Sequence, residues 1–144
     1  MEKKSVLFVC VHNSGRSQMA EAYFNQLGGN KAIASSAGTK PASKINPTVA
    51  QVMREAGLDI STKKPKLLTL DMMDSTDKVI SMGCGVADTC PAGIVPMEDW
   101  GAEDPEGKTV DEVRKIRDNI RYKVADLIKG LHLKDSLRLK GGEK

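Results

Sequence analysis

Residues 6–17 read VLFVCVHNSGRS, an apolar run followed by a polar loop that contains glycine. The apolar part is typical of a buried strand, and a helical pattern begins near Ser17. Between them stand a cysteine, five residues and an arginine, from Cys10 to Arg16. A loop between a strand and the start of a helix turns its backbone N–H groups inward and favours negative charge. We therefore predict an oxyanion-binding loop, and its residues are Val11, His12, Asn13, Ser14, Gly15 and Arg16.

Three side chains of this stretch carry the predicted chemistry. The positive field of the loop and of the helix N-terminus favours an ionised thiol, so we expect Cys10 to be a nucleophilic thiolate near neutral pH. The planar guanidinium of Arg16 can bind two oxygens of one anion at once. Ser17 can donate a hydroxyl hydrogen bond to the sulfur.

Length and composition exclude several classes of protein. The chain has 144 residues and a formal net charge of +3, which fits one domain with a sizeable core. Mild basicity suits an anionic substrate, and an aromatic content of 3% leaves few platforms for stacking bases. No segment approaches the length of a membrane span, and we find no cleavable signal pattern. We expect a cytoplasmic monomer that binds neither nucleic acid nor membranes.

Apolar runs alternate with helical patterns along the chain. Strands are predicted at residues 5–10, 32–36, 78–82 and 94–97, whose continuous apolar character suits a parallel sheet buried on both faces. Helices are predicted at residues 17–27, 47–56, 65–73 and 109–131, the third from the weakest pattern. This alternation favours a single doubly wound α/β domain that binds ligands at the carboxyl edge of its strands. The domain is placed at residues 1–131, and the polar tail, residues 132–144, is a candidate for disorder.

Two further cysteines, Cys84 and Cys90, follow the third predicted strand and so share an edge of the sheet with Cys10. Their spacing is not that of a zinc site. Two buried or incidental thiols are the simplest interpretation. The functional hypothesis is a thiol relay, in which Cys84 attacks a sulfur adduct at Cys10 and Cys90 then resolves the disulfide. We favour the relay because the three thiols are expected to meet beside an oxyanion loop.

Asp104 stands before Pro105 in a loop that follows the fourth predicted strand, again at the same edge. A carboxyl group there can act as general acid for a departing oxygen. The alternative is a surface turn, which is common for Asp-Pro sequences. Taken alone, the loop supports both interpretations equally.

The chain up to about Leu131 resembles the thioredoxin-coupled arsenate reductases of the low-molecular-weight protein tyrosine phosphatase fold. The resemblance is carried by residues 8–22 and 35–38, and by Cys84, Cys90-Pro91, Trp100-Gly101 and Asp104-Pro105. It implies a four-stranded parallel sheet flanked by helices, and an oxidoreductase of arsenic detoxification that reduces arsenate to arsenite. Phosphate and sulfate would be competing oxyanions, a thioredoxin-type protein would be the reductant, and no cofactor would be needed. The catalytic residues that it implies are Cys10, Arg16, Ser17, Cys84, Cys90 and Asp104.

The sequence departs from this family pattern in two places. The relay cysteines are one residue closer together than the family spacing. Some members bind a potassium ion near the loop, through positions that match Asn13, Glu21 and Ser36 together with an acidic residue. The nearest candidate for that acid is Lys66, whose ammonium could replace the ion, so we expect no metal.

Two alternative functions remain at this point. A protein tyrosine phosphatase of the same fold would carry aromatic residues after Pro105, whereas Glu106 and Gly107 follow it here. A non-catalytic oxyanion-binding or redox-sensing module would not need the intact set of Cys10, Arg16 and Asp104. Reduction of arsenate is therefore the predicted activity.

Overall fold

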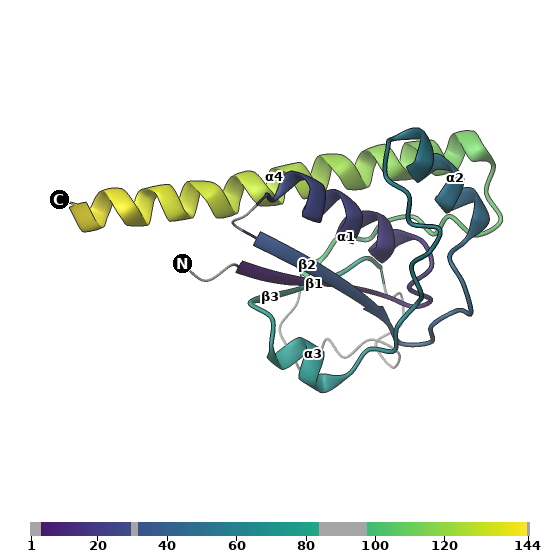
Figure 1. The fold of residues 1–144 in the computed structure, drawn as a ribbon, viewed down its shortest axis with the longest axis horizontal. Helices are drawn as coiled ribbons and strands as arrows, with labels where there is room; N and C mark the ends of the chain where they lie inside the picture. The colour runs from purple at the N-terminus through teal and green to yellow at the C-terminus, as the bar shows by residue number, and fades with distance from the viewer. Residues whose placement is uncertain (1–3, 30–31, 84–97, 144) are drawn as a thin grey trace.

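The computed structural model describes residues 4–29, 32–83 and 98–143, with side chains up to Gly130 in the last range. The strands are β1 (Lys4–Cys10), β2 (Ala32–Gly38), β3 (Lys78–Ser81) and β4 (Glu98–Asp99). The helices are α1 (Arg16–Leu27), α2 (Pro47–Glu55), α3 (Leu70–Asp74) and α4 (Val110–Glu143). Figure 1 shows the strands as one layer, with helices above and below it.

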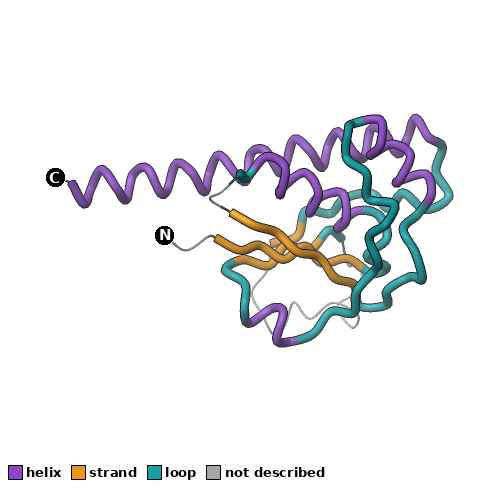
Figure 2. Tube along the Cα trace, viewed as in Figure 1, coloured by secondary structure: helices purple, strands orange, loops and turns teal. Residues whose placement is uncertain are grey.

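The sheet has four strands in the order β2-β1-β3-β4, and every pairing is parallel, which confirms the predicted fold class. The pairing of β1 with β2 sets Cys10 opposite Gly38 at the carboxyl edge. The predicted strand at residues 94–97 lies outside the described residues. The described part of the chain has β4 at two exposed residues that pair with β3, and Figure 2 shows the strands lying side by side.

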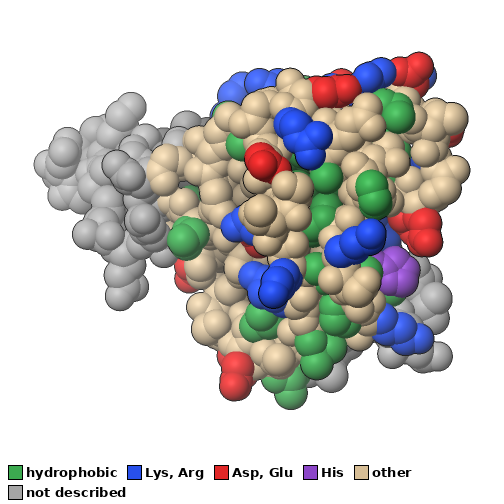
Figure 3. Space-filling view, turned by 45° about the vertical axis from the view of Figure 1, so that its right-hand side comes forward, with side chains coloured by type: hydrophobic (Ala, Val, Ile, Leu, Met, Phe, Trp, Pro, Cys, Tyr) green, Lys and Arg blue, Asp and Glu red, His purple; other side chains and the backbone are tan. Residues whose placement is uncertain are grey.

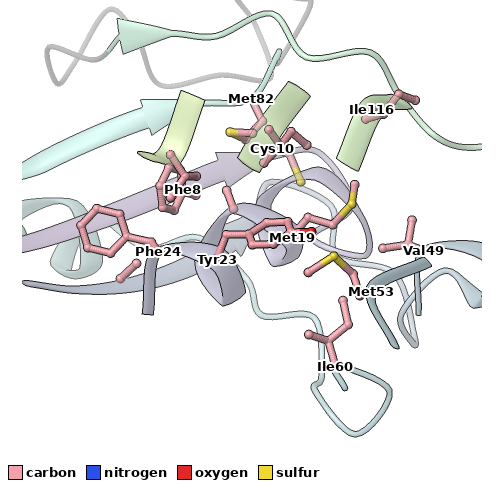
Figure 4. Packing of buried hydrophobic residues seen from close by; sticks show 14 of the residues in the cluster. Phe8, Cys10, Met19, Tyr23, Phe24, Val49, Met53, Ile60, Met82 and Ile116 are labelled. Atoms are coloured by element: carbon pink, nitrogen blue, oxygen red, sulfur yellow. The ribbon is translucent and has the colours of Figure 1, made fainter. Parts of the chain in front are cut away.

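Alternate residues of β1 point to the two faces of the sheet, as the period of a strand requires. Phe8 and Cys10 pack with α1, α2 and α4 in the larger core cluster, part of which Figure 4 shows from close by. Leu7 and Val9 pack on the other face, where α3 contributes Met73. Helices therefore cover both faces. The loop that follows β1 meets residues 82–83, which follow β3, at one edge of the sheet.

The third predicted helix, at residues 65–73, begins five residues before the observed helix α3 (Leu70–Asp74). In the structure α3 begins at Leu70, where the side chain of Thr69 accepts a hydrogen bond from the Met72 N–H. The preceding residues are extended because they pair with the end of β2. The carbonyl of Lys66 accepts from the Gly38 N–H, and the Leu68 N–H donates to the Gly38 carbonyl, both at 2.8 Å. A long-range pairing of this kind leaves no periodic signal in the sequence.

Helix α4 begins with a reciprocal cap and runs further than predicted. The hydroxyl of Thr109 accepts from the Glu112 N–H, while the Glu112 carboxylate accepts from the Thr109 backbone and hydroxyl. These hydrogen bonds hold the pKa of Glu112 below its ordinary value, and the bond from the Thr109 backbone has the largest effect. The predicted end near Leu131 is not observed, since the helix continues to Glu143. Residues 132–140 contain good helix formers and no proline or glycine.

No helix in the described ranges is long and apolar enough to cross a membrane. Figure 3 shows basic and acidic side chains interspersed over one face of the molecule. This distribution agrees with the small formal net charge of +3.

Candidate functional site

Cys10 and the oxyanion loop, residues 11–16, are held from outside by residues 39–46, which we call the clamp segment. The hydrogen bonds run from Thr39 N to Cys10 O (3.2 Å), Lys40 N to Val11 O (2.8 Å), Ala42 N to His12 O (2.9 Å) and Asn46 N to Ser14 O (2.9 Å). A trans peptide points its N–H away from its carbonyl. The N–H groups that follow these carbonyls therefore face the opposite side, where an anion would sit. Gly38 allows this close approach, because a Cβ there would lie 2.5 Å from the Val11 carbonyl oxygen.

Asn13 fixes the centre of the loop. Its φ of +50° is one that asparagine tolerates better than most residues. The buried side-chain oxygen accepts from the Gln18 amide at 3.1 Å and from the Lys66 backbone N–H at 2.9 Å. Its amide nitrogen donates to the Ser17 hydroxyl oxygen at 2.7 Å. The residue therefore links the loop, the first turn of α1 and the chain before α3.

The sulfur of Cys10 is buried and receives two hydrogen-bonding groups. The Asn13 backbone N–H donates to it at 3.2 Å, and the Ser17 Oγ lies 2.8 Å away. Because the Ser17 oxygen already accepts from the Asn13 amide, its own hydrogen is available to the sulfur. Both groups stabilise negative charge on sulfur, as does the N-terminus of α1, which begins at Arg16.

Arg16 joins the oxyanion loop to the residues that follow β3 and β4. Its Nη1 donates to the carbonyls of Met82 (3.3 Å), Gly83 (3.0 Å) and Ala102 (3.2 Å). Gly83 has a φ of +107°, and a Cβ there would lie 3.1 Å from that Nη1. The side chain of Arg16 is buried, yet it lines the cavity beside Cys10. One nitrogen is therefore used for positioning, while Nη2 lies 3.9 Å from Asp104 Oδ2.

The acid loop, residues 100–107, packs against the oxyanion loop through Pro105. A Cβ on Gly15 would lie 2.8 Å from the Pro105 Cγ, so only glycine permits this contact. Asp104 is half exposed and accepts the Glu106 N–H through Oδ1 at 3.0 Å. This hydrogen bond forms the surface turn that the Asp-Pro sequence suggested as an alternative to a general acid. The other carboxylate oxygen of Asp104 still faces Arg16.

These segments enclose a cavity of about 380 Å³ at the carboxyl edge of the sheet. Its walls come from the oxyanion loop, from residues 42–47 and from Asp104, Pro105 and Glu106 in the acid loop. Among the described residues that line it there is no phenylalanine, tyrosine or tryptophan. The cavity suits a small oxyanion held against Cys10, and its described walls offer no phenylalanine, tyrosine or tryptophan side chain to flank a tyrosine ring.

The predicted site residues that the structure describes lie together around this cavity. Its lining includes Cys10, His12, Ser14, Gly15, Arg16 and Asp104. Asn13 and Ser17 contact the Cys10 sulfur, and Val11 is bound to Lys40 through its backbone carbonyl. Cys84 and Cys90 lie outside the described residues. The clamp segment was missed, because neither its composition nor its spacing marks residues 39–46 as partners of the loop.

The lysine beside the buried carboxylate of Glu21 is Lys63, and not Lys66 as the sequence had suggested. Glu21 is buried on α1 and accepts the Ser36 hydroxyl at 2.8 Å. The ammonium that faces it is that of Lys63, at 3.7 Å, and not that of Lys66. Lys66 instead reaches Asn13 with its backbone N–H. Three lysines within residues 63–66 made the two positions hard to distinguish from the sequence.

Comparison with known proteins places this geometry in a family. Residues 5–137 match the family described as low molecular weight phosphotyrosine protein phosphatase. Glutaredoxin arsenate reductase of Synechocystis sp. is 38% identical over 128 residues, which are 87% of this chain and 96% of that protein. Arsenate reductase 1 of Staphylococcus saprophyticus is 35% identical over 128 residues, covering 86% and 95% of the two chains.

Solved structures show the same architecture. An arsenate reductase in the reduced state superposes with a TM-score of 0.75 at 38% identity, covering 88% of this chain and 98% of that one. A YwlE mutant from Bacillus subtilis superposes with a TM-score of 0.79 at 23% identity, covering 90% and 99% of the two chains. The second likeness concerns the fold alone.

Proposed function

The chain belongs to the low molecular weight phosphotyrosine protein phosphatase family, and we propose that it is an arsenate reductase that works through three cysteines. The observation that carries the proposal is the environment of the Cys10 sulfur. Ser17 and the Asn13 N–H both direct a hydrogen at it, beside Arg16 and at the open edge of the sheet. The names of the sequence relatives support arsenate as the anion that this site reduces.

The first step forms an arsenic–sulfur bond. The Cys10 thiolate attacks arsenic(V), and an As–O bond breaks as Asp104 gives its proton to the departing oxygen, which leaves as water. Loop N–H groups and Arg16 stabilise the charge on the remaining oxygens. Asp104 lines the cavity with Cys10, which supports this role.

Reduction follows in the second step. The Cys84 thiolate attacks the Cys10 sulfur, a disulfide forms, and the S–As bond breaks with its electron pair moving to arsenic. Arsenic(V) becomes arsenic(III), which leaves as arsenite, and the two cysteines are oxidised. The Cys90 thiolate then attacks Cys84 and releases Cys10 as a thiolate. The Cys84–Cys90 disulfide takes two electrons from an external dithiol, for which a thioredoxin-type protein is our first candidate.

The absence of phenylalanine, tyrosine and tryptophan among the described residues of the cavity wall favours this reaction over hydrolysis of phosphotyrosine. Phosphate is expected to bind in the same loop and to inhibit. A phosphocysteine has no accessible route to phosphorus(III), so the second step fails for phosphate.

The test is arsenate-dependent oxidation of a reduced dithiol protein. Reduced thioredoxin, or glutaredoxin with glutathione, is mixed with the chain and arsenate, and arsenite is measured directly. We expect turnover with at least one reductant, none in the Cys10→Ser chain, and a trapped Cys10–Cys84 disulfide in the Cys90→Ser chain. Arsenite production by Cys10→Ser would overturn the assigned nucleophile. Sustained turnover by Cys90→Ser would overturn the relay, and no arsenite from the wild-type chain would overturn the function itself.

A further inference from the structure

His12 touches all three walls of the cavity. Its backbone carbonyl accepts from Ala42 in the clamp segment at 2.9 Å. Its ring Nδ1 lies 3.3 Å from the Lys40 carbonyl oxygen, and its Nε2 lies 3.9 Å from the Glu106 Oε2 in the acid loop. Because a carbonyl oxygen can only accept, Nδ1 carries a hydrogen there. The other nitrogen is left facing a carboxylate, which attracts the ring when both nitrogens carry hydrogen.

Glu106 is tied in turn to the proposed acid. Its backbone N–H donates to Asp104 Oδ1 at 3.0 Å, and the intervening Pro105 rests on Gly15 of the oxyanion loop. A displacement of Glu106 therefore moves the Asp104 carboxyl relative to Cys10. The contact between Arg16 Nη2 and Asp104 Oδ2 also restrains the carboxyl group, but at 3.9 Å it leaves room for movement.

We propose that the side chains of His12 and Glu106 form a latch that positions Asp104 over Cys10. They are positioning residues, because the pair acts on the acid and not on the reacting atoms. The inference rests on the proposed function and adds to it a device that sets the rate of arsenic–sulfur bond formation. It predicts that breaking the latch slows that step without weakening the binding of the anion, since the loop N–H groups and Arg16 stay in place.

The experiment compares Glu106→Gln, His12→Gln and the double variant with a matched control, Glu103→Gln. Glu103 lies in the same loop and carries the same charge, but its carboxylate pairs with Lys108 at 3.3 Å and faces away from His12. The readout is the first arsenite formed by the fully reduced chain without external reductant. The inhibition constant of inorganic phosphate reports anion binding in parallel.

We expect Glu106→Gln to slow the first turnover by about 1.5- to 5-fold, the range of a partly exposed ion pair. Glu103→Gln should match the wild type, phosphate should bind Glu106→Gln no more weakly, and the effect of Glu106→Gln should vanish in the His12→Gln background. The latch is wrong if Glu106→Gln and Glu103→Gln give the same first-turnover rate, if the effects of Glu106→Gln and His12→Gln are independent, or if phosphate affinity falls together with the rate.

If the wild-type chain makes no arsenite, the proposed function fails. Hydrolysis of para-nitrophenyl phosphate, which uses the same thiolate and acid, then tests the latch with the same four variants.

Discussion

The hydroxyl oxygen of Ser17 lies 2.8 Å from the sulfur of Cys10. The same oxygen accepts a hydrogen bond of 2.7 Å from the side-chain amide of Asn13. The amide thereby directs the hydroxyl hydrogen toward sulfur, where it stabilises the thiolate. A hydrogen bond to a charged group contributes about 1.5–3 kcal/mol. We predict that Ser17→Ala lowers the rate of Cys10 alkylation by iodoacetamide at neutral pH about tenfold or more, measured by peptide mapping.

The control for this variant is Ser61→Ala. The hydroxyl of Ser61 donates to Asp59 in an exposed turn on the α2–α3 connection. Removing it takes away a serine hydroxyl without touching the oxyanion loop, so the rate should not change. Equal alkylation rates in Ser17→Ala and the wild type would show that the backbone N–H and the helix N-terminus suffice to hold the thiolate.

Asp104→Asn separates the two interpretations of the acid loop. Asparagine keeps an oxygen that can accept the Glu106 N–H, so the turn observed at 3.0 Å survives the substitution. The amide cannot give up a catalytic proton, so we predict that the first turnover with arsenate slows by about 10²–10⁴-fold. Phosphate inhibition should be nearly unchanged. An unaltered single-turnover rate would reduce Asp104 to a structural turn.

The oxyanion loop could be predicted from the sequence because its determinants are local. A strand, a short loop and a helix follow one another within residues 4–27, and their order brings Cys10 and Arg16 together. The clamp segment could not be predicted in this way. Its backbone groups meet the loop only because β1 and β2 pair in a register that sets Cys10 opposite Gly38, and backbone hydrogen bonds make no demand on the side chains involved.

The same limit explains why the sequence pointed to Lys66, whereas the structure places Lys63 beside Glu21. Which lysine faces Glu21 depends on the path of the chain after α2, and that path is set by the pairing of the Lys66 carbonyl with the Gly38 N–H. The pairing uses backbone atoms at residues 66–68, so residues 65–69, predicted to be helical, are not part of α3. One long-range contact thus accounts for both corrections.

Lys63→Met tests the charge pair behind the loop. Glu21 is buried, and the Lys63 ammonium at 3.7 Å is its cationic partner among the described residues. Loss of that partner leaves a buried carboxylate uncompensated, although the exposure of Lys63 reduces the cost. We predict a decrease of about 1 kcal/mol in the free energy of unfolding, measured by urea denaturation.

Lys66→Met is the matched control, since it removes the same charge three residues away. The contact of Lys66 with Asn13 is made by its backbone N–H and persists after the substitution. A surface change of this kind should alter the free energy of unfolding by less than about 0.5 kcal/mol. If Lys66→Met proved the more destabilising of the two, the assignment of Lys63 to Glu21 would be wrong.

Gly130→Ala tests the course of α4 beyond the globular part of the chain. Gly130 lies inside α4 (Val110–Glu143), and a Cβ added there would meet nothing within 4 Å. Glycine inside a helix costs about 0.5–1 kcal/mol relative to alanine, because it loses more backbone entropy on folding. We therefore predict that Gly130→Ala raises the free energy of unfolding by about that amount in urea titrations. Gly107→Ala is the contrasting variant: its φ of +74° strains any side chain, so the same substitution should destabilise the fold. A neutral or destabilising Gly130→Ala would mean that Gly130 does not lie in the interior of a stable helix.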